Sequence, residues 1–383
     1  MREGKIGPDL STVEECSPDQ PRHISELVNE YERANHPPYD IKDVRFAGIP
    51  QGHYGYNATG RFFDLPNPGD IDLFRQLRAM SLDNVAKEYQ RVASRIEMDL
   101  DERRSKVMFF SPVNSHWQIV PDAPVFERMQ DPHITWVTRK AGGKEFPRLV
   151  FIPVQTYDKF DEESGLGVGY GTRVFEGDSV NGLQDTGIYI HNSKDIRLKQ
   201  SPWGWHFLGT RPEKKYVNEK GEDCIRKYVA WDVFTDLDDF PHGIHNPRFL
   251  LENMLRKEEW AGIDDILFLD HDKWKIGLLL HLGYEQPDHI KHYAEAAMML
   301  DPVTGDHKGP WVINTRRDYP VEGQKILRED RMDALKDVLL FGNCWQNGSP
   351  TTLHMHYNAS DRYTFMMTRQ SPFPYPIVWH SQN

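Results

Sequence analysis

Helical spacing of apolar residues is confined to the first quarter of this chain of 383 residues, apart from one later run. An amphipathic helix is predicted at about residues 23–34, because the Pro-Pro pair that follows cannot continue it. A second helix is predicted from Ile71, where apolar residues recur every three positions, and Ser81 can cap a third through residue 92. We expect these apolar stripes to be packing surfaces.

From about Arg95 onward the pattern changes to short runs of β-branched and aromatic residues bounded by Gly, Pro, Asn or Asp, which is typical of strands. Helical periodicity returns only at residues 246–260, so a parallel sheet built from βαβ units is not expected. A β-propeller or a β-sandwich therefore remains as the expected fold. The predicted strands lie at residues 133–138, 148–154, 187–191, 228–234, 264–269, 275–280, 310–314, 337–342, 351–357 and 363–368.

The chain length favours the propeller. About 290 residues shared among about twenty strands leave roughly 15 residues for each strand and its turn, which suits about five four-stranded blades. We therefore predict an all-β fold, with residues 1–45 as an N-terminal helical extension and residues 46–383 as a five-bladed β-propeller. A helical insertion is expected at about residues 68–93. No internal repeat marks the blades.

Composition narrows the classes of partner. The chain has 46 Lys and Arg against 58 Asp and Glu, a formal net charge of −12, so a basic surface that tracks nucleic acid is not expected. Its apolar runs are far shorter than the ~20 residues of a membrane span. The amino terminus lacks the apolar core of a secretory signal, and three dispersed cysteines form no disulfide framework. We expect a cytoplasmic protein with neither nucleic acid nor membrane as a partner.

Several motifs are set aside. The glycine-rich run at residues 165–171 lacks the Lys-Ser/Thr of a phosphate-binding loop and no helix follows it, so a flexible turn is predicted. His354 and His356 face the same way along a strand, but no third ligand stands at a telling spacing, and no metal site is predicted. No G-x-S-x-G elbow occurs.

The segment FERMQDPHITWV is more informative. Asp131 stands just before a proline at the start of an apolar strand, which holds it in a turn. In a propeller such strand ends open toward the central channel. Aromatic neighbours that partly exclude water would raise the affinity of this carboxyl for a proton and suit it to acid catalysis. Taken alone, Asp-Pro is also a common structural turn.

Further motifs occur in order around it: ASRIEMDLDERRSKVMFF, NSKDIRL, DDILFLDHDKWKIGLLLHLG, HIKHYAEAAMMLDP, VINTRRDYP, DVLLFG and LHMHYNASDRYTF. Together, from about Phe46 to Pro376, they resemble the dual-activity β-1,2-mannosyltransferase/phosphorylase family, long known only as a domain of unknown function. That family is similar to the β-mannoside phosphorylases, whose Glu-Asp-Pro-Arg hallmark looks like residues 130–133 here.

The resemblance implies a five-bladed propeller enzyme that transfers mannosyl units with inversion, with Asp131 as the catalytic acid and phosphate replacing water. It implies mannose 1-phosphate, inorganic phosphate or GDP-mannose and a mannose or oligomannoside acceptor as partners, and neither a metal nor an organic cofactor. One cationic cradle would hold phosphate or the diphosphate of GDP-mannose. The implied binding residues are Lys194, Arg197, His281, His292, Tyr293, Arg316, Arg317 and Asp361.

Each assignment has an alternative. Surface pairs such as Arg316 and Arg317 are often solvated. The His292-Tyr293 pair precedes a helix-like AEAAMML run, and the alternative role of the pair is to cap it. Tyr170 is either a packing residue or a sugar-stacking platform. Two other functions stay open: an inverting propeller glycoside hydrolase that uses water, and a carbohydrate-binding propeller without activity. A hydrolase would need a base carboxylate opposite Asp131.

Overall fold

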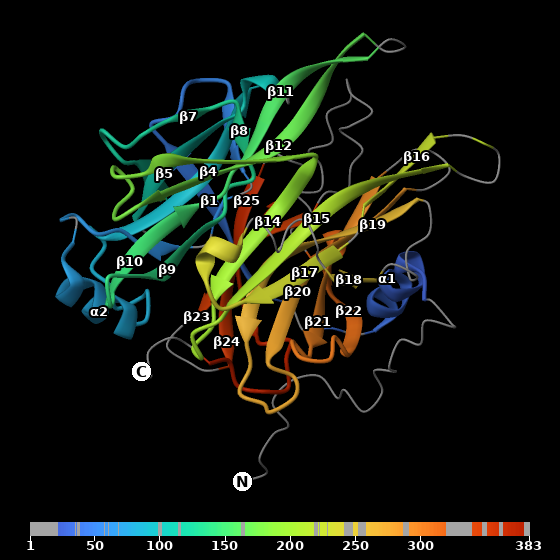
Figure 1. Cartoon of the computed structure of the whole chain (residues 1–383). Helices are drawn as coiled ribbons and strands as arrows, with labels where there is room; N and C mark the ends of the chain where they lie inside the picture. Colours follow the sequence, from blue (N-terminus) through green and yellow to red (C-terminus); the bar gives the residue numbers. More distant parts are fainter. Residues whose placement is uncertain are drawn as a thin grey trace.

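Antiparallel strands make up most of the protein and are arranged in four twisted sheets (Figure 1). The predicted mainly β fold is confirmed. The computed structural model describes residues 22–378 apart from 35, 37–38, 57, 60, 68, 99–101, 114–115, 162–164, 218–220, 222, 228, 241–247, 252–257, 286–290, 319–338, 347–350 and 360–362.

A ten-stranded sheet joins the first described strands to the last. Its order is β2 (His53–Tyr56), β4 (Gln90–Met98), β5 (Lys106–Val113), β6 (His116–Ile119), β1 (Asp40–Ala47), β25 (Tyr363–Gln370), β24 (Thr352–Ala359) and β23 (Leu339–Gln346), with β3 (Phe62–Phe63) on β4 and β7 (Phe126–Glu127) on β5. The connection is made by β1, which pairs in parallel with β6 and antiparallel with β25.

Three smaller sheets follow along the chain. The six-stranded sheet contains β8 (Met129–Gln130), β11 (Val154–Asp161), β12 (Gly165–Gly177), β10 (Lys144–Phe151) and β9 (Ile134–Ala141), with β13 (Gln184–His191) on β12. The five-stranded sheet contains β14 (Ser193–Gln200), β15 (His206–Val217), β17 (Val229–Phe234) and β18 (Arg248–Leu250), with β16 (Asp223–Lys227) on β15. The four-stranded sheet is a simple meander of β19 (Glu259–Phe268), β20 (Ile276–Glu285), β21 (Lys291–Leu300) and β22 (His307–Thr315).

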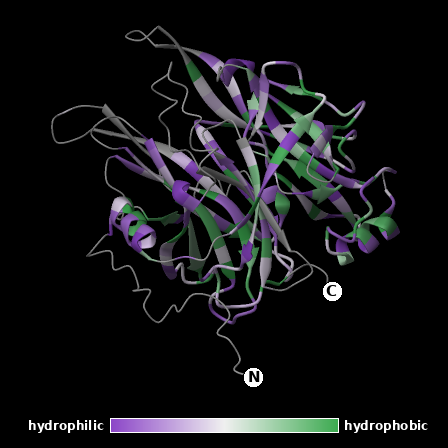
Figure 2. Ribbon diagram, turned by 180° about the vertical axis from the view of Figure 1, so that it is seen from behind, coloured by the Kyte–Doolittle hydropathy of each residue, from purple (hydrophilic) through white to green (hydrophobic). Residues whose placement is uncertain are grey.

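Two predicted helices are confirmed, α1 (Ile24–Arg33) and α2 (Ile71–Ala79), and both carry polar and apolar residues (Figure 2). The apolar side of α1 packs into the core of the four-stranded sheet, and the Ile24 amide donates to Oε1 of Glu259 at 2.8 Å. Asp70 caps α2 by accepting a hydrogen bond from the Leu73 amide at 2.9 Å. Short 3₁₀ turns are η2 (Glu102–Arg104), η3 (Leu237–Asp239) and η4 (Arg316–Asp318). None of the described helices is both long and apolar enough to cross a bilayer.

Several interpretations of local structure from the sequence are wrong. The helix expected from Ser81 is replaced by turns and then by β4, in which Val92 and Ala93 are fully buried. The helix expected at residues 246–260 is wrong where the structure describes it, because β18 and the start of β19 are strands. The helix-like run after Tyr293 lies within β21.

Strand β21 shows why a helical interpretation failed there. Ala, Met, Leu and Glu favour helices in isolation. In the protein, Ala296 and Met298 face one hydrophobic core while Ala297 and Met299 face another. A strand buried on both faces has no polar side, so its sequence shows a continuous apolar run instead of alternation.

The glycine-rich run is a strand as well, since residues 165–171 open β12. Two of its glycines make room for tyrosine rings on neighbouring strands: a Cβ on Gly169 would collide with Tyr157, and one on Gly171 would collide with Tyr189. Close packing of rings on the strand therefore explains these glycines, and the predicted flexible turn is wrong.

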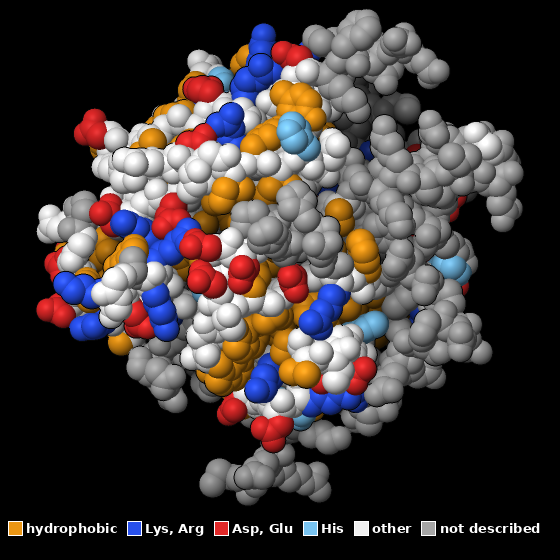
Figure 3. Space-filling view, in the orientation of Figure 1, with side chains coloured by type: hydrophobic (Ala, Val, Ile, Leu, Met, Phe, Trp, Pro, Cys, Tyr) orange, Lys and Arg blue, Asp and Glu red, His pale blue; other side chains and the backbone are white. Residues whose placement is uncertain are grey.

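The charge distribution agrees with the mixed composition. On the face drawn in Figure 3, described Lys and Arg side chains lie among Asp and Glu side chains, with hydrophobic atoms between them. That face therefore presents no field of a single sign.

Candidate active site

Asp131 lies in the turn between β8 and β9, with its side chain 16% exposed. Its backbone has a φ of 47°, in the left-handed region that residues other than glycine rarely adopt. Nη1 of Arg95 stands 3.5 Å from Oδ1 of Asp131, and Nε of the same guanidinium donates to Oε2 of Glu97 at 2.8 Å. Arg95 and Glu97, both on β4, are buried. The carboxyl of Asp131 is thus partly open on one side and held by a buried ion pair on the other.

Lys194, at the start of β14, lies over the ring of Tyr170 with Nζ 3.2 Å from the ring centre. The Tyr170 hydroxyl donates to Oε2 of Glu102 in η2. Burial lowers the pKa of Lys194, while the negative charges of Glu102 and Asp131 act in the opposite direction. The Lys194 ammonium group therefore lies in the electrostatic field of Asp131. The charges of Glu102 and Asp131 replace only part of the stabilisation that the ammonium group loses when burial removes its water.

A second ion-pair system adjoins Lys194. Oδ2 of Asp195 is 3.1 Å from Nε of Arg211 and 4.0 Å from Nε2 of His281. Burial alone would raise the pKa of Asp195, but Arg211, His281, Arg197 and Lys194 together lower that pKa to about 2. Asp195 also has a left-handed backbone, with φ 55°. An ionised aspartate therefore gathers four basic side chains at one place.

His281 bridges this system to the interior. Nη1 of Arg211 lies 3.1 Å from Nε2 of His281, and Nδ1 of His281 lies 2.7 Å from Oδ1 of Asp264. Gly262 makes room for the imidazole: a Cβ there would stand 2.6 Å from Nε2 of His281 and 3.2 Å from Oδ2 of Asp195. The strand β19 therefore has to carry a glycine at this point.

Two residues anchor β14 to its neighbours. Nε of Arg197 donates to the Asp264 carbonyl at 2.8 Å, so part of this buried guanidinium serves the backbone. Nε2 of His133 lies 2.8 Å from the Leu198 carbonyl oxygen and 3.1 Å from the Leu198 amide nitrogen, so one ring nitrogen faces both backbone groups of Leu198. Burial first, and then the charge of Arg197, lower the pKa of His133 to about 3. A neutral His133 thus ties the turn that carries Asp131 to the strand that carries Lys194.

The structure joins four of the predicted binding residues, Lys194, Arg197, His281 and Tyr293, in one network, and Lys194 links that network to Asp131. Tyr293 joins through its ring, whose centre is 6.1 Å from that of His281. Three others are placed differently. His292 stacks on Tyr284 at 5.1 Å, Arg316 is buried in η4, and Arg317 is 75% exposed and pairs with Glu32 of α1 at 2.9 Å. Asp361 lies outside the described residues.

Sequence reasoning missed several members of this network. Arg95 and Asp195 stand inside two motifs that carry the resemblance, ASRIE and KDIRL, but nothing in these motifs indicates a role for either residue. Arg211 had no local signal at all. Asp264 and Glu295 stand in apolar strands, and the structure buries both. An acidic residue among β-branched or small residues is the sequence feature that could have indicated them, because a buried acid needs a partner.

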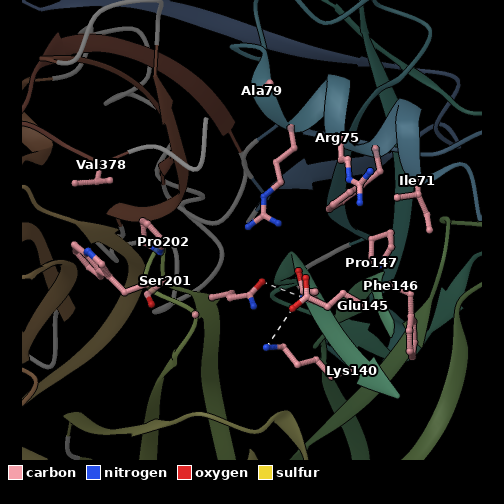
Figure 4. Close-up of a pocket in the computed structure, with 16 residues that line it drawn as sticks. Ile71, Arg75, Ala79, Lys140, Glu145, Phe146, Pro147, Ser201, Pro202 and Val378 are labelled. Carbon is pink, nitrogen blue, oxygen red and sulfur yellow. Dashed lines mark hydrogen bonds and ion pairs between the residues drawn. The ribbon is translucent and has the colours of Figure 1, made fainter. Parts of the chain in front are cut away.

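A separate hollow of about 490 Å³ lies at the far ends of β9 and β14 (Figure 4). Its walls come from α2, the β9–β10 hairpin and the turn after β14. In Figure 4, Lys140 and Glu145 are joined by an ion pair of 3.1 Å, and Trp203 lines the same space. Because Lys140 follows Asp131 by nine positions along the chain, at about 3.3 Å for each strand residue, this hollow is distant from Asp131.

A family model described as "Protein of unknown function (DUF1861)" matches residues 80–373. The chain belongs to this family. The matched part of this DUF1861 protein contains Asp131, Lys194, Arg211 and His281, and it begins after α1 and α2. Membership confirms the family relationship inferred from the ordered motifs. No curated protein matches the sequence.

Solved structures share the fold of this DUF1861 protein over nearly their whole length. MPT-4, a mannose phosphorylase from Leishmania mexicana in complex with a phosphate ion, has a TM-score of 0.67 and 17% identity, covering 93% of this chain and 96% of that one. MPT-1, a GDP-Man-dependent mannosyltransferase from Leishmania mexicana, has a TM-score of 0.62 and 16% identity, covering 95% and 98%. At these identities the similarity establishes a common fold.

Proposed function

We propose that this DUF1861 protein transfers mannosyl units with inversion, making or phosphorolysing β-1,2-linked oligomannosides. The observation that carries the proposal is the meeting of Asp131 with Lys194, Arg211 and His281 in one network. An acid beside a cluster of cations suits transfer between a sugar and phosphate. The fold shared with a mannose phosphorylase and a mannosyltransferase supports mannose as the sugar.

Asp131 is the proposed general acid. Backbone strain of the kind at Asp131 is concentrated at functional sites, where the surrounding structure holds the residue in place. During phosphorolysis its proton passes, through a hydroxyl of the bound mannosyl ring, to the glycosidic oxygen of the leaving group. A phosphate oxygen forms the new bond to the anomeric carbon from the opposite face as the glycosidic bond breaks. In synthesis the same steps run backward and Asp131 regains its proton.

The proposed anion cradle consists of Lys194 and Arg211 beside His281, whose imidazole fixes the Arg211 guanidinium. A bound phosphate would replace part of the hydration that the Lys194 ammonium loses on burial, and the planar guanidinium of Arg211 offers paired donors. Arg197 supports the cradle from behind, since its Nε is already engaged by the Asp264 carbonyl. The same cradle accommodates inorganic phosphate, the phosphate of mannose 1-phosphate or the diphosphate of GDP-mannose.

The proposed acceptor is mannose or a short oligomannoside. Tyr170 and Tyr293 stand beside the cations and are the aromatic rings available to a bound sugar. Contributions from His292, Arg316, Arg317 and Asp361 stay predictions. The chemistry proposed needs one acid and one anion, and therefore calls for neither a metal nor an organic cofactor.

We also infer a five-bladed propeller. Three blades correspond to the six-, five- and four-stranded sheets, and the ten-stranded sheet supplies two more, β4–β6 and β23–β25, joined through β1. In this arrangement α1 belongs to an N-terminal extension that ends where β1 enters the ten-stranded sheet, and α2 belongs to an insertion, whose helix borders the hollow of Figure 4. The mouth of the propeller would then carry Asp131.

The direct test is incubation of the purified protein with mannose 1-phosphate or GDP-mannose and a mannose acceptor. Growth of oligomannosides, followed by chromatography, is the expected result, and inorganic phosphate added to the product should reverse it. Hydrolysis that is indifferent to phosphate would identify a glycosidase instead. A folded protein that consumes neither donor with any manno-acceptor would contradict the proposal.

A further inference from the structure

Glu295 is an acid in the interior of the four-stranded sheet that the proposed reaction does not use. It is 0% exposed on β21, directly opposite His281 of β20 and next to Asn314 of β22 in the strand register. Within the described part of the chain, and apart from each other, neither oxygen of Glu295 nor Oδ2 of Asp264 has a hydrogen-bond partner. A carboxylate left in this state would be costly, because nothing replaces the water that it lost.

The two acids satisfy each other. Glu295 makes a side-chain hydrogen bond with Asp264. Two carboxyl groups form such a bond only when one of them carries a proton, so the pair holds one proton and one negative charge. Burial, and then the neighbouring charge of Asp264, raise the pKa of Glu295 well above its usual value, which agrees with this arrangement.

The charge that remains on Asp264 sets the state of His281. Because Oδ1 of Asp264 accepts from Nδ1 of His281 at 2.7 Å, the imidazole carries a proton on Nδ1. Arg211 can only donate, so Nε2 of His281, 3.1 Å from Nη1 of Arg211, is the acceptor. Hydrogen bonds therefore lead from Glu295 through Asp264 and His281 to the guanidinium at the anion cradle.

We propose that Glu295 is a positioning residue that stays protonated and, by donating to Asp264, holds His281 and Arg211 in the geometry that receives the anion. The charged and titratable groups around this chain are Asp195 and Arg197 of β14, Arg211 of β15 and Tyr357 of β24. Among these described groups, Glu295 and Asp264 are the two acids joined by a hydrogen bond. The role in anion binding rests on the proposed function, whereas the shared proton does not.

The shared proton is tested without any substrate. The infrared spectrum of the wild-type protein at neutral pH should contain the C=O stretch of a buried carboxylic acid, and Glu295→Gln should lack it. The amide of this variant still donates to Asp264, so the fold should be preserved. A difference spectrum of wild type against Glu295→Gln that shows no such band overturns the proposal.

The positioning role is tested by inorganic phosphate binding in calorimetry and by phosphate KM. Glu295→Gln should stay within about threefold of wild type, whereas Glu295→Leu, which cannot donate, should weaken phosphate binding at least about tenfold with little change in KM for the acceptor. Glu259→Leu removes another buried glutamate of the same sheet and should leave phosphate binding unchanged. Equal phosphate binding by Glu295→Leu and wild type overturns the role. A wild type that binds no phosphate contradicts the proposed function instead, and the infrared result still decides the shared proton.

Discussion

Arg95 holds Asp131 from the side that faces the protein interior, with Nη1 3.5 Å from Oδ1, while its Nε is fixed by Glu97 at 2.8 Å. The guanidinium is buried and the Asp131 carboxyl is partly exposed. In the proposed mechanism, orientation and proton transfer are thus divided between two residues, since of this pair Asp131 is the more exposed. This division allows the chemical step to be removed without dismantling the anion cradle.

Asp131→Asn should lower kcat for phosphorolysis by about 10²- to 10⁴-fold, the usual contribution of a general acid. The amide keeps the size of the side chain but has no proton to give. Inorganic phosphate should bind with a Kd within a few-fold of wild type, because Lys194, Arg211 and His281 are untouched. Steady-state kinetics and calorimetry measure the two effects. Near-normal kcat in a folded Asp131→Asn protein would place the acid elsewhere.

The lowered pKa of Lys194 predicts a pH dependence of anion binding. Burial lowers the pKa of this ammonium, so the positive charge is present below the shifted pKa and is lost as pH rises through it. Phosphate affinity should therefore fall as pH rises through the alkaline range below about 10.4, the ordinary pKa of lysine.

Substitutions of Lys194 test whether its ammonium group is the one whose titration lowers phosphate affinity. Lys194→Arg keeps its charge throughout that range and should show a flatter alkaline profile. Lys194→Met should weaken phosphate binding at neutral pH by about 1.5–3 kcal/mol, or roughly 10- to 150-fold, the value of a hydrogen bond to a charged group. Calorimetric titrations of the three proteins with inorganic phosphate give the comparison. Identical alkaline profiles for wild type and Lys194→Arg would exclude Lys194 as the titrating group.

Local sequence patterns were sufficient for much of the fold and for singling out Asp131 as a candidate residue. Strands such as β9 and β20 combine turn residues at their ends with β-branched or aromatic residues within them, and α1 shows its amphipathic period directly. Asp131 stood out because it precedes a proline at the start of an apolar strand. These features depend on neighbours along the chain, which the sequence displays.

The rest depends on contacts between distant segments. Arg211 and Asp195 meet because β14 and β15 pair as a hairpin, and Asp264 reaches His281 only after β19 pairs with β20. Glu295 was missed for a related reason: an acid among alanines and methionines resembles a helix when its two burying cores are unknown. Arg317 has a local context like that of a binding residue, but it pairs with Glu32 at the surface.

Substitution of Gly262 tests whether the position of His281 affects phosphate binding. Gly262→Ala would place a methyl group 2.6 Å from Nε2 of His281, so the imidazole has to move away from Arg211 and Asp195. Phosphate KM should rise at least about tenfold, through loss of a hydrogen bond to a charged group. Gly305→Ala is the matched control: it strains a backbone with φ 83° but would meet only a Trp231 atom at 3.6 Å. The control should lose stability in thermal unfolding with its phosphate KM unchanged, and an unchanged KM in Gly262→Ala would argue against a role of His281 in phosphate binding.

Buried neutral histidines predict the stability of the protein in mild acid. Burial lowers the pKa of His133 and of His356 to about 3, and that of His206 to about 4. In the unfolded chain each imidazole titrates near 6.5, so protonation favours unfolding, and the stabilising contribution present above that pH is lost as pH falls toward the folded-state values.

The free energy of unfolding should therefore decrease between about pH 6.5 and pH 4, by up to about 1.4 kcal/mol for each histidine and pH unit. Urea denaturation across this range measures the slope. His133→Gln retains an acceptor for the Leu198 amide but cannot take up a proton. Its unfolding free energy should therefore decrease less steeply with falling pH, by the contribution of one histidine. Because His133 ties the Asp131 turn to β14, loss of activity should accompany loss of stability in acid for the wild type and begin at lower pH in His133→Gln. Parallel slopes for the two proteins would show that His133 takes up its proton in the folded protein as readily as in the unfolded chain, which contradicts the prediction.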